Sequence, residues 1–189
     1  MPDPMHFDRH ADLYDRARPP YPDALWERLR ALGLLSEGKR ALDVGAGTGQ
    51  ATQALVSAGM HVTAIEPGAA LAARLRERLP SVRVLQTSAE DADLPPAAFD
   101  VVTIATAVHW FDLDVVLPKL HAALASGGRL AVWRNAYGDE SVPPTPFRRR
   151  MQEIVARRNA PPRPVPGESD TAQWARLLET GGLFAVATM

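Results

Sequence analysis

Residues 41–50 read ALDVGAGTGQ, a short apolar run that leads directly into a turn with glycine at every second position. The run 41–44 is typical of a buried strand, because its side chains are almost all apolar. Glycine at 45, 47 and 49 permits positive φ angles and lets a ligand lie against bare backbone. The segment predicts a strand followed by a ligand-binding turn and a helix.

Further apolar runs, rich in β-branched residues, are continuous rather than alternating, as in parallel strands that are covered on both faces. Helical patterns separate most of them, and Asp112 is a good N-cap for one. The arrangement predicts an α/β fold with a doubly wound, mostly parallel sheet, whose ligands bind outside the carboxyl ends of the strands. Expected strands are 41–44, 62–65, 82–85, 101–105 and 129–133, and expected helices are 22–32, 48–58, 69–79 and the segment after Asp112.

The composition indicates one ordinary globular domain of 189 residues with 46% hydrophobic residues and a net charge of −1. This balance argues against a nucleic-acid partner, because proteins that bind nucleic acids usually carry a basic patch. The absence of cysteine excludes disulfides, thiolate zinc sites and a cysteine nucleophile. No apolar run is long enough to span a membrane, and residues 1–22 lack the apolar region of a signal peptide. We therefore expect a cytoplasmic protein.

The glycine turn does not fit the common nucleotide-binding motifs. A dinucleotide fingerprint requires glycine at 50, where this chain has Gln50, and no phosphate-binding GxxxxGK motif is present. Glu66, at the end of the second expected strand, is placed to chelate ribose hydroxyls; the alternative is a solvated carboxylate before a turn. Asp43 either accepts N–H groups of the glycine loop or reaches a ligand's ammonium group through water.

Four segments together resemble a known family. They are ALDVGAGTGQ at 41–50, Glu66, SAED at 88–91 and FDVVTIATAVHWFD at 99–112. They are similar to class I S-adenosylmethionine-dependent methyltransferases of the type 11 group. YDRARPPYP at 14–22 together with HWFD at 109–112 resembles the relatives of trans-aconitate methyltransferase. The resemblance covers residues 7–133.

The resemblance implies S-adenosylmethionine as the cofactor and assigns roles to matching positions. The glycines would pass beneath its methionine part, Glu66 would bind its ribose, and the Ala89 N–H and Glu90 would lie at the adenine edge, while Ser88 replaces the aspartate that many relatives have. An N-terminal lid would supply an arginine for the carboxylate and tyrosine rings beside the sulfonium. The implied positions are Tyr14, Arg18, Tyr21, Asp43, Gly45, Ala46, Gly47, Gly49, Glu66, Pro67, Ser88, Ala89, Glu90, Thr106 and Ala107.

Methyl transfer from a sulfonium needs alignment more than it needs acid or base catalysis. A base is required only when the acceptor must lose a proton. His109 is the candidate for catalysis or substrate contact, with a structural histidine as the alternative. Trp110 and Phe111 are expected to pack as core or pocket wall. The arginines at 148–150 are expected on a solvated helix face, and the less favoured alternative is that they hold an anionic acceptor. No spacing of the histidines suggests a metal site.

The expected organisation is a single domain, with lid helices at 1–38, a cofactor-binding core at 39–134 and a substrate-side and C-terminal segment at 135–189. Family members resemble one another in having seven strands. Here only 183–188 reads as a strand beyond the fifth, with helices expected at 147–158 and 171–178. We therefore expect an incomplete sheet whose fifth strand is covered by the C-terminal segment or paired with a second copy, which makes a homodimer conceivable.

The function indicated is methyl transfer to a small-molecule acceptor, of which a carboxylate is one candidate. Two alternatives remain open: a nicotinamide-dependent oxidoreductase on a similar fold, and a non-catalytic cofactor-binding fragment. Gln50 and the lack of a Tyr-x-x-x-Lys pair count against the oxidoreductase. The residues do not identify the acceptor.

Overall fold

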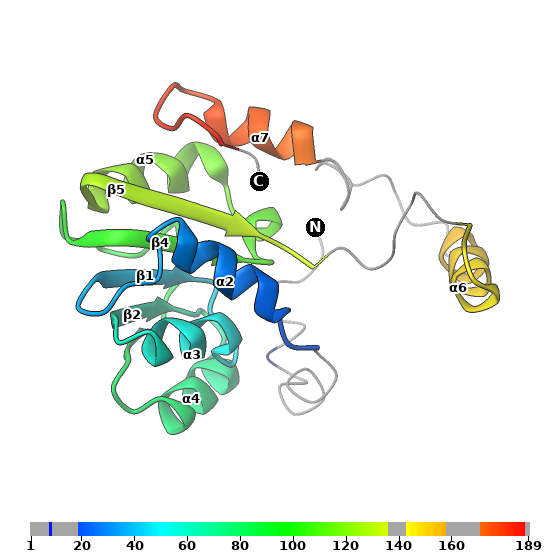
Figure 1. Cartoon of the computed structure of the whole chain (residues 1–189), viewed down its shortest axis with the longest axis horizontal. Helices are drawn as coiled ribbons and strands as arrows, with labels where there is room; N and C mark the ends of the chain where they lie inside the picture. The colour runs from blue at the N-terminus through cyan, green and yellow to red at the C-terminus, as the bar shows by residue number, and fades with distance from the viewer. Residues whose placement is uncertain (1–7, 9–18, 136–142, 158–170, 188–189) are drawn as a thin grey trace.

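The computed structural model describes Asp8 and residues 19–135, 143–157 and 171–187. Within these ranges lies a five-stranded parallel sheet with the order β3-β2-β1-β4-β5 (Figure 1). The strand order reverses between β1 and β4, which is where open α/β sheets bind ligands. The strands are β1 Arg40–Val44, β2 His61–Ile65, β3 Arg83–Leu85, β4 Phe99–Ala105 and β5 Leu124–Trp133. The predicted doubly wound parallel sheet is confirmed.

Helices cover both faces of this sheet (Figure 1). Helices α2, α3 and α4 bury one set of side chains, including Ala41, Val62 and Val101, while α5 and α7 bury the opposite set, including Leu42 and Ile104. Burial on both faces explains why the strands are apolar without alternation. The helices are α2 Asp23–Ala31, α3 Gln50–Ser57, α4 Ala69–Arg78, η3 Val108–Trp110, α5 Leu113–Ala123, α6 Pro146–Ala156 and α7 Thr171–Glu179.

Local signals set the ends of two helices. Helix α3 begins at Gln50 rather than at the predicted Thr48, because Gly49 has a φ of 91° and turns the chain into the helix from a left-handed conformation. Asp112 caps α5 as predicted, since its carboxylate accepts a hydrogen bond from the N–H of Asp114. No helix within the described ranges is both long and apolar enough to cross a membrane.

The described part of the chain leaves the outer edge of β5 without a strand partner. Residues 183–187 are not a strand, so the expected strand at 183–188 is wrong over its described part. Instead the N–H of Val186 donates to the carboxylate of Glu179, 3.0 Å away, which folds this segment back on α7. The segment, β5 and α2 line a groove of about 920 Å³. Pairing of this edge with a second copy stays a prediction.

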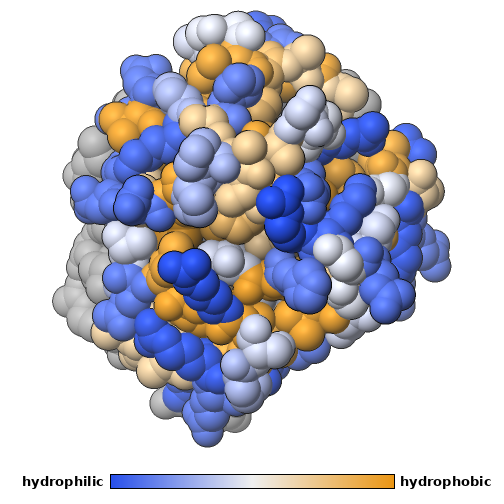
Figure 2. Space-filling model, turned by 90° about the vertical axis from the view of Figure 1, so that its left-hand side faces the viewer, coloured by the Kyte–Doolittle hydropathy of each residue, from blue (hydrophilic) through white to orange (hydrophobic). Residues whose placement is uncertain are grey.

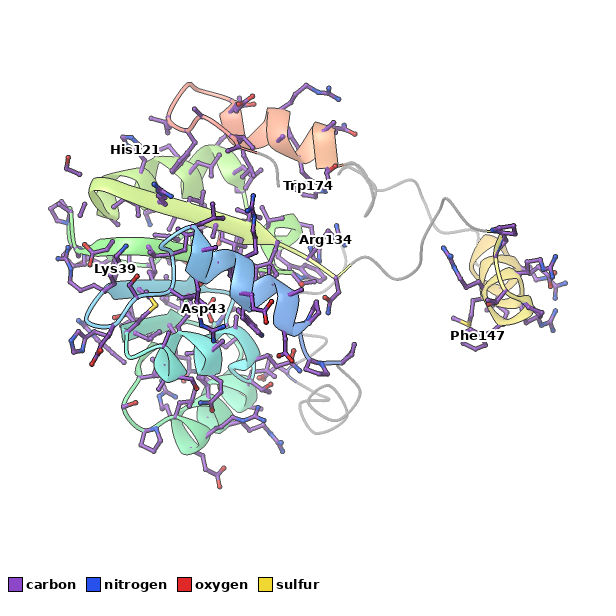
Figure 3. The ribbon with its side chains drawn as sticks, viewed as in Figure 1. Lys39, Asp43, His121, Arg134, Phe147 and Trp174 are labelled. Carbon is purple, nitrogen blue, oxygen red and sulfur yellow. The ribbon has the colours of Figure 1, made fainter. Side chains whose placement is uncertain are left out.

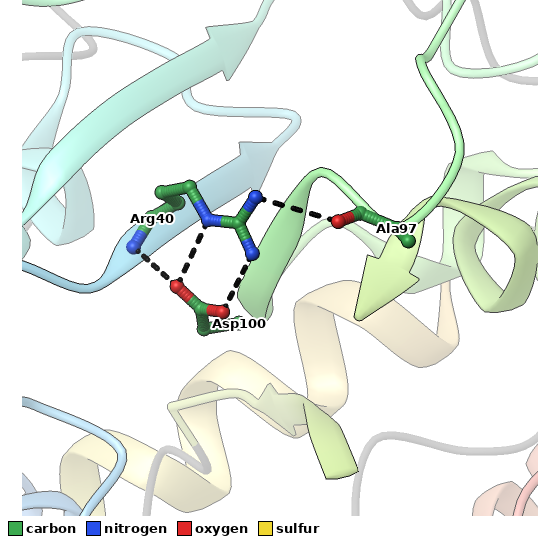
Figure 4. Close-up of polar contacts among 3 residues, drawn as sticks. All are labelled: Arg40, Ala97 and Asp100. Carbon is green, nitrogen blue, oxygen red and sulfur yellow. Dashed lines mark hydrogen bonds and ion pairs between the residues drawn. The ribbon is translucent and has the colours of Figure 1, made fainter. Parts of the chain in front are cut away.

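An ion pair joins β1 and β4 at their amino ends (Figure 4). The guanidinium of Arg40 contacts both carboxylate oxygens of Asp100, at 2.8 and 3.1 Å, and its backbone N–H donates to the same carboxylate. The hydrogen bonds from Arg40 lower the pKa of Asp100 to about 2. On the face at the left of Figure 1, hydrophilic and hydrophobic residues are mixed at the surface (Figure 2).

Candidate functional site

The glycine turn lies at the carboxyl end of β1, in a conformation that requires glycine. Gly45, Gly47 and Gly49 have φ angles of 72°, 59° and 91°. A side chain at Gly45 would bring its Cβ within 2.6 Å of the Ala107 Cβ, closer than real Cβ contacts allow. The N–H of Gly45 donates to the carbonyl of Ile65 at 2.9 Å, which ties the turn to the end of β2. The turn is therefore held between β2 and the segment after β4.

Glu66 clamps the glycine turn from the end of β2. It is 6% exposed, and its two carboxylate oxygens accept N–H groups of Gly47 and Gly68, each at 2.8 Å. Burial raises the pKa of Glu66 above its ordinary value, the two N–H groups act in the opposite direction, and the nearby carboxylates of Asp8 and Asp43 raise the pKa further. Each oxygen has used one acceptor position and retains another, so Glu66 could also accept ligand hydroxyls.

Asp43 forms its hydrogen bonds with two threonines and not with the glycine loop. Its carboxylate is fully buried and accepts the hydroxyl of Thr52 at 2.6 Å and that of Thr103 at 2.9 Å. Burial raises the pKa of Asp43, and the threonine hydrogen bonds partly oppose this rise. Asp43 therefore joins β1 to α3 and β4 within the body of the molecule (Figure 3), while the N–H of Gly47 in the glycine loop donates to Glu66. The alternative contact with a ligand's ammonium group through water stays a prediction.

The turn after β4 brings two more predicted residues to this edge. Thr106 has a φ of 58°, and its N–H donates to the carbonyl of Trp133 at 2.7 Å. The Thr106 hydroxyl lies 2.9 Å from that of Tyr21, which is 6% exposed. Ala107 follows and is buried against the glycine turn. Tyr21, Thr106 and Ala107 are thus brought together with the glycine turn.

His109 lies on η3, the short helix after this turn. It is half-buried, and its ring centroid lies 4.9 Å from that of Trp110. Trp110 and Phe111 are partly buried and pack against the hydrophobic core that includes side chains of α5, as expected for residues of the core or of a pocket wall. His109 therefore stands at the carboxyl edge of the sheet, one turn beyond Thr106.

The loop after β3 contains the residues expected at the adenine edge. The Ser88 hydroxyl donates to the carboxylate of Asp91 at 2.7 Å and accepts its N–H at 3.1 Å. Ala89 is buried. The Glu90 carboxylate accepts the N–H of Asp112 at 2.9 Å, and its carbonyl accepts the ammonium of Lys119. Glu90 thus holds the start of α5, a partner that the sequence did not suggest.

Some residues near the site have contacts that the sequence did not predict, and two of the predicted site residues lie outside the described part of the chain. Tyr14 and Arg18 lie outside the described residues, and Pro67 is exposed after Glu66. Asp8 accepts the N–H groups of Ala70 and Leu71, at 2.7 and 3.0 Å, and thereby caps α4. Nothing in the sequence pairs Asp8 with a helix that starts 61 residues later, whereas threonines inside apolar segments could have signalled partners for Asp43.

Residues lining the carboxyl edge enclose a small cavity of about 20 Å³ between Tyr21 and the glycine turn. The larger groove beside β5, which Trp133 helps to line, contains none of the predicted cofactor positions. Over the described ranges, no three histidine, aspartate or glutamate side chains form a group that could hold a metal ion. On α6, Arg149 and Arg150 are exposed, and Arg150 pairs with Glu153 at 2.9 Å.

Comparison with known proteins agrees with this geometry. Residues 42–132 match a family model described as a methyltransferase domain. An uncharacterized methyltransferase from Mycobacterium tuberculosis is 34% identical over 160 residues, which cover 84% of this chain and 62% of that protein. Trans-aconitate 2-methyltransferase from Paracidovorax citrulli is 33% identical over 126 residues, which cover 65% of this chain and 46% of that protein.

A solved structure leads to the same family. A protein from Anaeromyxobacter dehalogenans, described as a type II methyltransferase, aligns with a TM-score of 0.61 at 36% identity, over 77% of this chain and 61% of that one. The chain spans about three-fifths of the length of the mycobacterial relative, at 62%. The matched domain, these relatives and the parallel sheet with its glycine turn identify residues 42–132 as a methyltransferase domain similar to the type 11 group of class I.

Proposed function

We propose that this chain binds S-adenosylmethionine at the carboxyl edge of its sheet and transfers the methyl group to a small-molecule acceptor. The observation that carries the proposal is Glu66, a buried carboxylate that already holds the glycine turn and retains acceptor positions for ribose hydroxyls. A buried acid without a cation as partner is costly, and such groups gather at functional sites.

The residues at this edge fit the cofactor. The three glycines of the turn have positive φ, and at Gly45 and Gly49 an added Cβ would collide with neighbouring side chains. Glu66 would bind the ribose, and the turn at Thr106 would border the sulfonium. When bound, the cofactor would supply a methyl group on a positively charged sulfur, and this sulfur would become a neutral thioether once the methyl group is bonded to the acceptor. The protein's part is to align the two reactants and exclude water.

Calorimetric titration tests the cofactor. We expect binding of S-adenosylmethionine and S-adenosylhomocysteine, and no binding of NAD. Glu66→Ala should weaken binding by about 1–3 kcal/mol, the usual cost of leaving buried hydrogen-bonding groups unpaired. Glu77→Ala, on the exposed side of α4, is the matched control and should bind normally. Normal affinity in Glu66→Ala would contradict the ribose assignment, and binding of NAD instead would favour an oxidoreductase.

A carboxylate is the acceptor class that we propose. The support is the likeness to a trans-aconitate 2-methyltransferase and the chemistry, since a carboxylate is already deprotonated and needs no base. Release of S-adenosylhomocysteine from a panel of small di- and tricarboxylic acids tests this class. Turnover with amines or phenols but with none of the acids would overturn it.

His109 is the proposed acceptor contact, because η3 places it at the carboxyl edge just after the Thr106 turn. Toward a carboxylate it would act as a donor or charge partner rather than as a base. His109→Ala should lower turnover at saturating cofactor more than it lowers cofactor affinity. If His109→Ala instead loses cofactor affinity and keeps normal turnover at saturating cofactor, the proposed contact of His109 with the acceptor is wrong.

A further inference from the structure

One hydrogen bond crosses the candidate site from the N-terminal flank of α2 to the turn after β4. It joins the hydroxyls of Tyr21 and Thr106 at 2.9 Å, over 85 residues of sequence. The Tyr21 ring packs edge-on against Trp26 and Trp133, with centroid distances of 5.7 and 5.9 Å. Because these two indoles also pack edge-on against each other, the ring has little freedom, and its hydroxyl has a fixed position.

Thr106 stands in a conformation that its side chain disfavours. Its φ of 58° is left-handed, and within the described ranges Ala97 is the one other non-glycine residue with a positive φ. A β-branched residue rarely adopts this conformation, which persists only when the surroundings enforce it. Two contacts enforce it here: the N–H bond to the carbonyl of Trp133 and the hydroxyl bond to Tyr21.

The strained turn sets the spacing between two parts of the site. Directly after Thr106 comes Ala107, which lies so close to Gly45 that no side chain fits between them. His109 follows on η3. A relaxation of Thr106 toward right-handed or extended backbone would change the direction of this segment and move both residues away from the glycine turn.

We infer that Tyr21 and Thr106 act as a positioning pair. The Tyr21 hydroxyl holds Thr106 left-handed, and this conformation keeps the turn against the glycine loop, where the cofactor is proposed to bind. The inference rests on the proposed function for its ligand, but it assigns the pair a role of its own: Tyr21 acts on the cofactor through Thr106 and not only through its ring.

A double-mutant cycle tests the pair. Tyr21→Phe and Thr106→Val each remove one hydroxyl at nearly constant shape. Thr180→Val, which removes an exposed hydroxyl at the end of α7, is the control. Each site variant should weaken binding of S-adenosylhomocysteine by about three- to tenfold, the double variant should lose no more than either single one, and the control should bind normally. Thr106→Ser, which keeps the hydroxyl, should recover most of the loss.

Thermal unfolding supplies a readout that needs no ligand. Tyr21→Phe should lower the unfolding temperature of the natural chain but not that of the Thr106→Val chain. Thr106→Gly should unfold no earlier than Thr106→Ala, against the usual order, because glycine tolerates a positive φ. Additive losses in either cycle would overturn the inference. So would variants whose unfolding temperature is lowered but whose affinity for S-adenosylhomocysteine is unchanged. Failure of the natural chain to bind S-adenosylhomocysteine would instead refute the proposed function, and the unfolding cycle would still decide on the pair.

Discussion

The two ends of β4 shift the pKa of a neighbouring carboxyl group in opposite directions. At the amino end, Asp100 is partly exposed and paired with Arg40, which lowers its pKa to about 2. Near the carboxyl end, Asp43 is fully buried, accepts uncharged donors of its described partners Thr52 and Thr103, and has a raised pKa. Both ends also carry a left-handed non-glycine residue, Ala97 before the strand and Thr106 after it.

The difference separates an exposed ion pair from buried acids beside the candidate site. An exposed ion pair costs little to form and contributes little to stability. Buried acids such as Asp43 and Glu66 are costly unless their acceptor positions are used, and such groups gather at functional sites, which supports the site proposed at this edge. The following experiments test this contrast, beginning with the largest expected effect.

Asp43→Ala should be the most destabilising change. It leaves the buried hydroxyls of Thr52 and Thr103 without their acceptor, at an expected cost of about 2–4 kcal/mol in the free energy of unfolding. Urea denaturation measures this cost. Asp100→Ala, at the other end of the sheet, is the control and should cost much less; equal losses would remove the contrast between the two ends.

Gly45→Ala should cost about 2–3 kcal/mol. The added Cβ would meet the Cβ of Ala107 at 2.6 Å, in addition to the penalty for a positive φ. Gly38→Ala isolates that penalty, because Gly38 has a φ of 75° and no atom within 4 Å of the added Cβ, so about 1 kcal/mol is expected there. If the two variants unfold at the same denaturant concentration, the glycine turn is not packed against Ala107.

Ala97→Gly should change stability by less than about 1 kcal/mol, in the stabilising direction. Relief of the left-handed strain at a φ of 51° offsets the entropy that glycine adds to the unfolded chain. Ala73→Gly, on the exposed side of α4, should lose about 1 kcal/mol and serves as the control. Thermal unfolding compares them, and a loss at Ala97 as large as that at Ala73 would show that Ala97 is unstrained.

Asp100→Asn should have the smallest effect, confined to acid. Because the folded pKa of Asp100 is lowered to about 2, its contribution is present above the ordinary value of about 3.9 and is lost as the pH falls toward 2. The unfolding temperature of the variant should therefore fall less than that of the natural chain between pH 4 and about 2. This difference should be smaller at high salt. An unaltered acid limb at low salt would show that the pair contributes nothing.

The carboxyl edge should respond to pH with the opposite sign. The pKa values of Asp43 and Glu66 are raised on folding, so their contribution is fully present below the ordinary pKa of a carboxyl group and is lost as the pH rises through the folded values. Asp43→Asn should flatten this decline above pH 4, whereas Asp100→Asn should leave it unchanged. The unfolding temperature followed from pH 4 to 8 measures both.

Strands, their parallel arrangement and the glycine turn were predictable from the sequence, because each depends on a local property. Continuous apolar runs predict strands that are buried on both faces, and alternating glycines predict a turn with positive φ. These signals placed four strands to within two residues at each end, placed the start of β5 five residues too late, and located Glu66 at the carboxyl edge. Local capping also predicted the start of α5 at Asp112.

Only the tertiary structure decided which polar groups meet. The pairing of Asp43 with Thr52 and Thr103, of Glu66 with Gly47, and of Tyr21 with Thr106 depends on how distant segments approach one another. For the same reason residues 183–187 are not a strand despite their apolar sequence: a strand exists only where a neighbouring backbone completes its hydrogen bonds, and this segment lies against α7 instead. Local sequence thus determined the elements, while long-range packing determined the chemistry at their ends.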